Sequence, residues 1–178
     1  MDRKSKKRGK ICPFIPAYCY TVSETKQTLT SPDNEDPFNP SFTENIVRFT
    51  TQPQNCKNII FPDPENQNTF LLQLSGVYLT KWIITLVSDS SIPVLTYLTT
   101  AQNRLFSGSI NTRDVMPGNF SQLSGQHLVK VKAPIRIQLR VSSISNSIVT
   151  LPIRNVNNIG CSISASFMIK RIDDFASK

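Results

Sequence analysis

Apolar and polar residues alternate along most of the chain from residue 46 onward, with the two-residue period of β-strands. The longest run, residues 70–86, reads FLLQLSGVYLTKWIITL and divides at Ser75-Gly76, where we expect a turn or a close backbone approach. Beyond the glycine, apolar side chains fall on both faces of the predicted strand, so the pattern predicts that a second subunit covers one face. The residues expected to serve as core and subunit contact are Val77, Tyr78, Leu79, Trp82, Ile83 and Ile84.

Two later segments show the clearest alternation. In APIRIQLRVSS, four aliphatic residues alternate with Arg136, Gln138 and Arg140, which predicts a strand with one solvated face. In CSISASFMIKRI, Cys161 falls on the inward face, where we expect it to act as a small buried apolar residue. Further strands are predicted at residues 46–51, 58–61, 92–99, 105–110, 125–132 and 147–153.

No segment has an amphipathic helical period. Strands spaced by roughly 8–12 residues, without helices between them, are typical of antiparallel sandwiches. The expected fold class is therefore all-β, an antiparallel jelly-roll sandwich.

The N-terminal part differs in composition from this body. The chain has 178 residues and a net charge of +8, of which +5 lies in residues 1–10. The basic residues of this tail are Arg3, Lys4, Lys6, Lys7, Arg8 and Lys10. Such a run is typical of a solvated tail, and the alternatives are a nucleic-acid arm or docking onto an acidic surface.

An apolar segment, ICPFIPAYCY, follows the basic run at residues 11–20. Two prolines exclude a helix and favour an extended path. One interpretation is an assembly connector that docks on another subunit; the other is an N-terminal strand of the same domain. The connector residues are Ile11, Cys12, Pro13, Phe14, Ile15, Pro16, Ala17, Tyr18, Cys19 and Tyr20.

A polar, proline-punctuated stretch at residues 21–42 reads as a linker. The domain division predicted from these segments is a tail, connector and linker at residues 1–42 and a jelly-roll domain at residues 43–178. The basic run and short apolar segment do not make a signal peptide, because prolines break the apolar part and no small-residue cleavage pattern follows. We therefore expect synthesis without a cleaved signal peptide.

Cysteine pairing is left open by the spacing. Cys12, Cys19 and Cys56 are candidates for a disulfide, with Cys56 placed to meet a tail cysteine. An extended path over about 20 Å separates Cys12 from Cys19, so each is expected to meet a cysteine of the body or of another chain. None of the cysteines has zinc-site spacing, and His127 is the only histidine. We expect no cofactor, no metal site and no enzyme activity.

The order of these motifs resembles the trimeric jelly-roll heads of the complement-type and tumour-necrosis-factor-like superfamily. The matching pieces are the strand with Gly76, Tyr78 and Trp82, then SIPVLTYLT, SGQHLVKVKAPIRIQLRVSS and ISASFMIKRI. The nearer resemblance is to the C-terminal heads of BclA-type exosporium glycoproteins of bacterial spores, although this chain has no collagen-like stalk. With an N-terminal connector in place of the stalk, the arrangement also resembles endospore appendage subunits.

The resemblance implies a self-assembling structural protein of the spore surface, or exosporium. It would be a stacked homotrimer, used as a fibre subunit or as an anchor beside other spore-surface proteins and without membrane contact. The alternative function, suggested by the basic arm, polar linker and jelly roll, is a small viral capsid protein in the virion. Its basic arm would neutralise packaged nucleic acid.

Overall fold

The chain folds into two antiparallel β-sheets, and the computed structural model describes residues 14–23, 27–29, 46–50, 56–88, 91–143, 149–151 and 165–174. Every regular element in these ranges is a strand, and none is a helix that could span a membrane. The strands are β1 Tyr18–Ser23, β2 Gln27–Leu29, β3 Ile59–Ile60, β4 Phe70–Leu72, β5 Gly76–Ser88, β6 Ile92–Thr100, β7 Asn111–Val115, β8 Ser121–Val131, β9 Ile135–Ser143, β10 Val149–Leu151 and β11 Ala165–Asp173.

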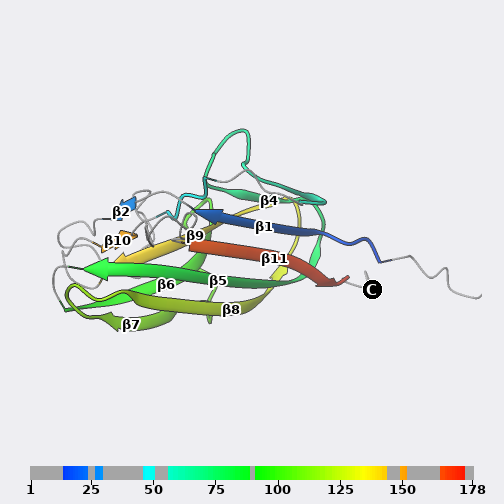
Figure 1. Cartoon of the computed structure of the whole chain (residues 1–178). Coiled ribbons are helices and arrows are strands. Elements are labelled where there is room, and N and C mark those ends of the chain that lie inside the picture. Colours follow the sequence, from blue (N-terminus) through cyan, green and yellow to red (C-terminus); the bar gives the residue numbers. More distant parts are fainter. Residues whose placement is uncertain are drawn as a thin grey trace, which may run out of the picture.

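The first sheet is organised around β5, its longest strand. On one side β5 pairs with β11 and, near its end, with β10; on the other it pairs with β8 over eleven consecutive register positions, from Gly76–Val131 to Leu86–Ser121. β1 adds to the far side of β11, and β2 adds to β10. Figure 1 shows β1, β11, β5 and β8 lying side by side.

The second sheet has the order β3-β4-β9-β6-β7, again antiparallel. Strands adjacent in sequence around β5 thus belong to different sheets, because β4 lies in the second sheet and β5 in the first. This crossing between sheets is the antiparallel jelly-roll sandwich predicted from the strand pattern.

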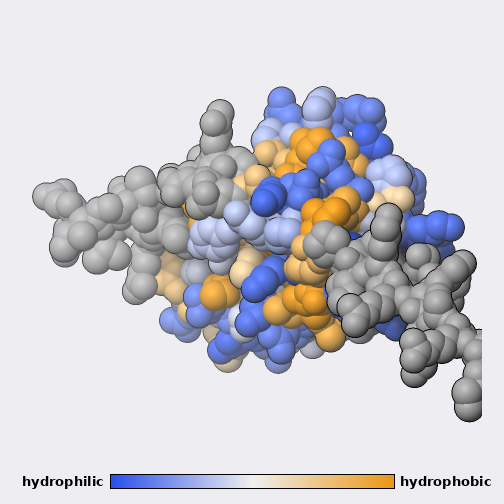
Figure 2. All heavy atoms as spheres, turned by 90° about the vertical axis from the view of Figure 1, so that its right-hand side faces the viewer, coloured by the Kyte–Doolittle hydropathy of each residue, from blue (hydrophilic) through white to orange (hydrophobic). Residues whose placement is uncertain are grey.

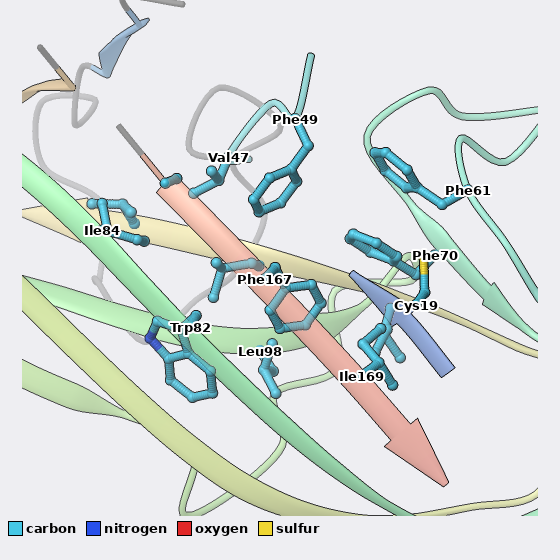
Figure 3. Close-up of a cluster of buried hydrophobic side chains, with 14 of the residues drawn as sticks. Cys19, Val47, Phe49, Phe61, Phe70, Trp82, Ile84, Leu98, Phe167 and Ile169 are labelled. Atoms are coloured by element: carbon cyan, nitrogen blue, oxygen red, sulfur yellow. The ribbon is translucent and has the colours of Figure 1, made fainter. Parts of the chain in front are cut away.

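Aromatic rings from both sheets and from the segment at residues 46–50 fill the space between the sheets (Figure 3). Phe167 of β11 contacts Phe70 of β4 edge to face, with ring centroids 4.9 Å apart. Phe70 stacks on Phe61 at 4.2 Å, and Phe49 stacks on Phe167 at 5.9 Å. The alternation in β11 places Ala165, Phe167 and Ile169 inward, which explains why this side of the strand is apolar up to Arg171.

The break predicted at Ser75-Gly76 is confirmed, and its cause is a close approach. Gly76 has φ +154°, and a Cβ there would overlap the carbonyl oxygen of Asp173 and lie 2.7 Å from Arg171 Nε. Only glycine lets the chain pass from β4 to β5 this close to the end of β11.

Several strand predictions were wrong in detail. Residues 105–110 form turns and one isolated bridge rather than a strand, whereas the polar sequence NTRDV forms β7 at the sheet edge. Ile46 makes only an isolated bridge to Arg140. β9 has no solvated face, because Gln138, Arg140 and Ser142 are buried as well as the aliphatic side.

The predicted domain boundary between residues 42 and 43 is corrected, because β1 and β2 lie before it and belong to the first sheet. Ala17, Cys19, Thr21 and Ser23 point into the core, and Tyr18, Tyr20 and Val22 point outward. This two-residue period identifies residues 18–23 as a strand of the domain. The strand spans the end of the predicted connector, residues 11–20, and the start of the predicted linker, residues 21–42.

Candidate interaction surface

The outward side of the first sheet carries a set of apolar side chains arranged in cross-strand rows. One row runs from Tyr18 through Lys170 and Leu79 to Leu128. The next row contains Tyr20, Met168 and Lys81, and the third contains Val22 and Ile83. We call the outward residues Tyr18, Tyr20, Leu79, Ile83 and Leu128 the apolar face.

Large side chains of the apolar face are open to solvent in the single chain. Tyr18 is 41% exposed, Tyr20 48%, Ile83 44% and Leu128 55%. Beside Ile83 the surface is hollowed by an open depression of about 390 Å³, whose lining includes Lys81, Asn111 and Gln126. Orange apolar groups are also visible on the end of the molecule shown in Figure 2. Large apolar side chains exposed together on neighbouring strands are typical of an interaction site.

Two lysines interrupt the apolar face. Lys170 lies between Tyr18 and Leu79, and Lys81 lies between Met168 and Gln126. Both are exposed, and a lysine stem can add apolar contact area while its ammonium group stays at the rim. The face is therefore suited to a partner that covers the apolar rows and leaves the ammonium groups solvated or paired.

The inward side of the same strand fixes the position of the apolar face. Tyr78, Trp82, Ile84 and Leu86 of β5 are each at most 1% exposed. Trp82 Nε1 donates a hydrogen bond of 3.0 Å to Thr96 Oγ1 on β6, in the opposite sheet. Opposite Trp82 on β8 stands Gly125, where a Cβ would overlap indole atoms Cζ2 and Cε2.

A disulfide between Cys19 and Cys56 ties the N-terminal strand to the segment that leads into β3. The bond closes a loop with a sequence separation of 37 residues. In the chain-entropy model, such a bond lowers the conformational entropy of the unfolded chain and so stabilises the fold by about 4 kcal/mol. Next to it, Tyr18 and Lys57 exchange two backbone hydrogen bonds of 3.0 and 2.8 Å. Asn58 Nδ2 donates to the Pro16 carbonyl at 2.8 Å.

Arg171 holds the start of the N-terminal segment from the other side. Its guanidinium donates to the Ile15 carbonyl at 2.7 Å and twice to the Ser75 carbonyl, at 2.6 and 3.0 Å. It also pairs with Asp174 and lies 5.4 Å from the ring centroid of Phe14. Arg171 is only 8% exposed, so this one side chain joins residues 14–15, the β4–β5 turn and the end of β11.

No family model matches this chain, and no curated protein matches it. Among solved structures, it is similar to the crystal structure of murine APRIL with a TM-score of 0.54, at 9% sequence identity. The match covers 89% of this chain and 100% of that chain. The fold is a tumour-necrosis-factor-like jelly roll. At this low identity the likeness shows the fold and nothing finer.

The TNF-like sandwich divides the predicted strand residues into two groups. Tyr78, Trp82 and Ile84 are core residues, whereas Ile83 is exposed and Val77 and Leu79 are half-buried. The two-sided apolar pattern in β5 thus corresponds to one core face and one outward face.

Two interpretations of residues 11–20 were left open by the sequence, and the part that the structure describes matches the second, an N-terminal strand of the same domain, rather than a connector. Ala17 and Cys19 are buried in their own domain, and Tyr18–Ser23 pairs with β11, so this part is a strand of the jelly roll. Phe14, Ile15, Tyr18 and Tyr20 remain exposed. Ile11, Cys12, Pro13 and the basic tail lie outside the described residues, as does Cys161.

The face of β9 that was predicted to be solvated carries Arg136 and Arg140, and both make specific contacts within the domain. Arg136 is paired with Asp63 at 2.6 Å and with Glu65 at 2.8 Å. Arg140 is buried; its Nη2 donates to Asn103 Oδ1 at 2.6 Å and to Gln138 Oε1 at 2.9 Å, and burial lowers its pKa. Burial also raises the pKa of Tyr97.

His127 faces inward at the edge strand β8, half-buried beside Gly108, and desolvation lowers its pKa. Within the described ranges, no three His, Cys, Asp or Glu side chains come together as a metal site. Sequence reasoning missed the roles of Arg171 and Gly125. A basic residue that ends an apolar strand, and a glycine in the middle of one, were the available signals.

Proposed function

We propose that this protein is a structural, self-assembling subunit whose jelly rolls associate as a homotrimer through the apolar face. The observation that carries the proposal is the row Tyr18–Lys170–Leu79–Leu128, which continues across four adjacent strands on the outward side of one sheet. The TNF-like fold supports the trimer, because the heads that this sequence resembles are trimeric. A second copy of the chain is the occupant that this resemblance favours.

The energetics favour covering this face. At roughly 25 cal/mol per Å² of apolar area, burying several half-exposed tyrosine, leucine and isoleucine side chains per subunit contributes several kcal/mol. Association costs translational and rotational freedom, so the face has to be shared by several contacts to give a stable assembly. A closed ring of three places the face of every subunit in an equivalent contact.

We extend the proposal to the spore surface, where the trimer would be a fibre subunit or an anchor next to other spore-surface proteins. The resemblance to exosporium heads and to appendage subunits supports this location. Since Ala17 and Cys19 are buried in their own domain and Tyr18 and Tyr20 belong to the apolar face, docking through the N-terminal segment would use its exposed Phe14 and Ile15 side chains.

Light scattering of the full chain during size-exclusion chromatography tests the assembly. The expected result is a mass of three chains at micromolar concentration, and a stable monomer under the same conditions would contradict the proposal. Electron microscopy of the same sample distinguishes stacked fibres from isolated trimers. Immunogold labelling of spores tests the location, and an unlabelled spore surface would remove that part of the proposal.

A capsid protein is the second candidate, favoured by the net charge of +5 in residues 1–10. Such a tail would bind nucleic acid through phosphates and without base readout. Closed shells in electron microscopy, with nucleic-acid binding that weakens steeply as salt rises, would favour this candidate over the spore-surface protein.

A further inference from the structure

We infer that the Cys19–Cys56 disulfide controls assembly, because it holds in place the strand that supplies two aromatic residues to the apolar face. With the bond formed, β1 presents Tyr18 and Tyr20 for association; with the bond reduced, β1 loosens and assembly weakens. The inference rests on the proposed function and adds its regulation by thiols.

The placement of the disulfide supports this role. Cys19 lies between Tyr18 and Tyr20 in β1 and points the opposite way, so it is 1% exposed while both tyrosines are open. A bond at Cys19 therefore fixes the backbone that carries the two exposed rings, without occupying the face itself. Figure 3 shows the Cys19 sulfur within the buried cluster near Phe70.

Among the residues that the structure describes, three recorded hydrogen bonds join the N-terminal segment to residues 57–58, next to Cys56. They are the two Tyr18–Lys57 backbone hydrogen bonds and the Asn58–Pro16 hydrogen bond, all near exposed residues. On its other side, β1 keeps its six register positions with β11 and the Arg171 bond to Ile15. Loss of the disulfide is thus expected to increase local opening of β1 rather than to unfold the sandwich.

The chemical step is thiol–disulfide exchange with a dithiol. A thiolate of the dithiol attacks the Cys56 sulfur, which is half-buried and hence more accessible than that of Cys19. The S–S bond breaks, and Cys19 leaves as a thiolate and takes up a proton. The second thiol of the reagent then attacks the mixed disulfide, which frees Cys56 and closes the reagent to a cyclic disulfide. Two electrons pass from the reagent to the protein.

The test compares the full chain oxidised and after treatment with dithiothreitol under native conditions. Light scattering over a dilution series gives the midpoint of trimer dissociation, and hydrogen exchange reports on β1 and, as an internal reference, on β9. On reduction we expect the midpoint to rise by about tenfold or more, and amide exchange in β1 to accelerate by a similar factor while β9 is unchanged.

Two variants separate this disulfide from the other cysteines. Cys19→Ala/Cys56→Ala is expected to behave like the reduced chain without any reagent; if it does not fold, the reduced wild-type chain gives the same reading. Cys12→Ser/Cys161→Ser keeps the bond and should respond to dithiothreitol like the wild type. If the response is lost in this second pair, another cysteine controls assembly and the inference is wrong.

The outcomes distinguish the inference from the function on which it rests. A trimer that dissociates at the same concentration when oxidised and when reduced overturns the inference and leaves the trimer intact. An oxidised chain that stays monomeric overturns the proposed function, and the inference with it.

Discussion

The indole of Trp82 occupies the space that a side chain at Gly125 would need, on the neighbouring strand of the same sheet. A Cβ at Gly125 would overlap indole atoms Cζ2 and Cε2 and lie 2.5 Å from Asn111 Nδ2. The indole in turn reaches Thr96 in the opposite sheet through its Nε1 hydrogen bond. One glycine therefore permits the ring orientation that links the two sheets under the apolar face.

Gly125→Ala is expected to destabilise the domain by about 1–3 kcal/mol, since the added methyl group forces the indole out of its position. Chemical denaturation followed by tryptophan fluorescence measures this change, because the chain has one tryptophan. Ser124→Ala on the same strand is exposed and should stay within about 0.5 kcal/mol. Equal stabilities of the two variants would show that the indole moves at no cost.

Thr96→Val removes the acceptor of the Trp82 hydrogen bond and leaves a buried indole N–H without a partner. The expected loss is about 1–3 kcal/mol in the free energy of unfolding. Thr99→Val is the matched control, because Thr99 is fully buried on the same strand and its hydroxyl has no hydrogen-bond partner among the described residues. That replacement should be neutral or stabilising. If both variants lose the same stability, packing rather than the hydrogen bond explains the effect.

Period-two alternation was sufficient to predict the fold class and most strands of the body. β6, β9 and β11 each have an apolar side that faces the core, and the pattern records that requirement directly. β7 was missed because an edge strand with three exposed residues needs no apolar alternation. The strand expected at 105–110 failed because turns interrupt it.

Contacts between residues distant in the sequence were harder to predict than the strands, which the alternation of apolar and polar residues indicates. The buried polar side of β9 could not be foreseen, since Arg140 looks like a surface residue until Asn103 and Gln138 surround it. For the N-terminal segment the sequence left a connector and a strand of the same domain open, because its prolines favour an extended path that suits either. Its inward residues, Ala17 and Cys19, are small or ambiguous, so pairing with β11 is visible only in three dimensions.

Arg171→Lys should loosen the N-terminal segment, because a lysine cannot bond the Ile15 and Ser75 carbonyls together as the guanidinium does. We expect a loss of about 1.5–3 kcal/mol and faster hydrogen exchange at the start of β1. Lys170→Gln, at the adjacent exposed position, is the control and should change neither quantity. Unaltered exchange at residues 15–18 in Arg171→Lys would mean that Arg171 does not anchor the segment.

Acidification should lower the stability of the domain partly through His127, whose pKa is lowered by desolvation in the folded chain. The unfolded chain binds this proton more readily, with a pKa of about 6.5, so protonation favours unfolding. The contribution of His127 is therefore full above about pH 6.5 and is lost as the pH falls through the lower folded-state pKa. His127→Gln should show a smaller drop in Tm between about pH 7 and pH 5 than the wild type. If the Tm of His127→Gln and that of the wild type fall by the same amount over this pH range, His127 does not contribute to the pH dependence of stability.

Ile83→Lys places a charge in the middle of the apolar face without touching the core, because Ile83 is 44% exposed and points away from the second sheet. In an assembled trimer the lysine would be desolvated, and the apolar contact would be lost. Together these effects are expected to cost about 2–3 kcal/mol per subunit contact and, summed over the three contacts of the ring, to raise the dissociation midpoint by about a hundredfold or more.

The control for Ile83→Lys is Met116→Lys, because Met116 is 54% exposed but lies in the β7–β8 connection, outside the cross-strand rows. Both variants add the same charge, so a general effect of net charge would appear in both. Light scattering should find monomers for Ile83→Lys and trimers for Met116→Lys. At concentrations where the wild-type chain is monomeric, both variants should have a Tm close to that of the wild type. If Ile83→Lys still forms trimers at the wild-type midpoint, the subunits associate through a different surface, and the apolar face has to be assigned to another partner.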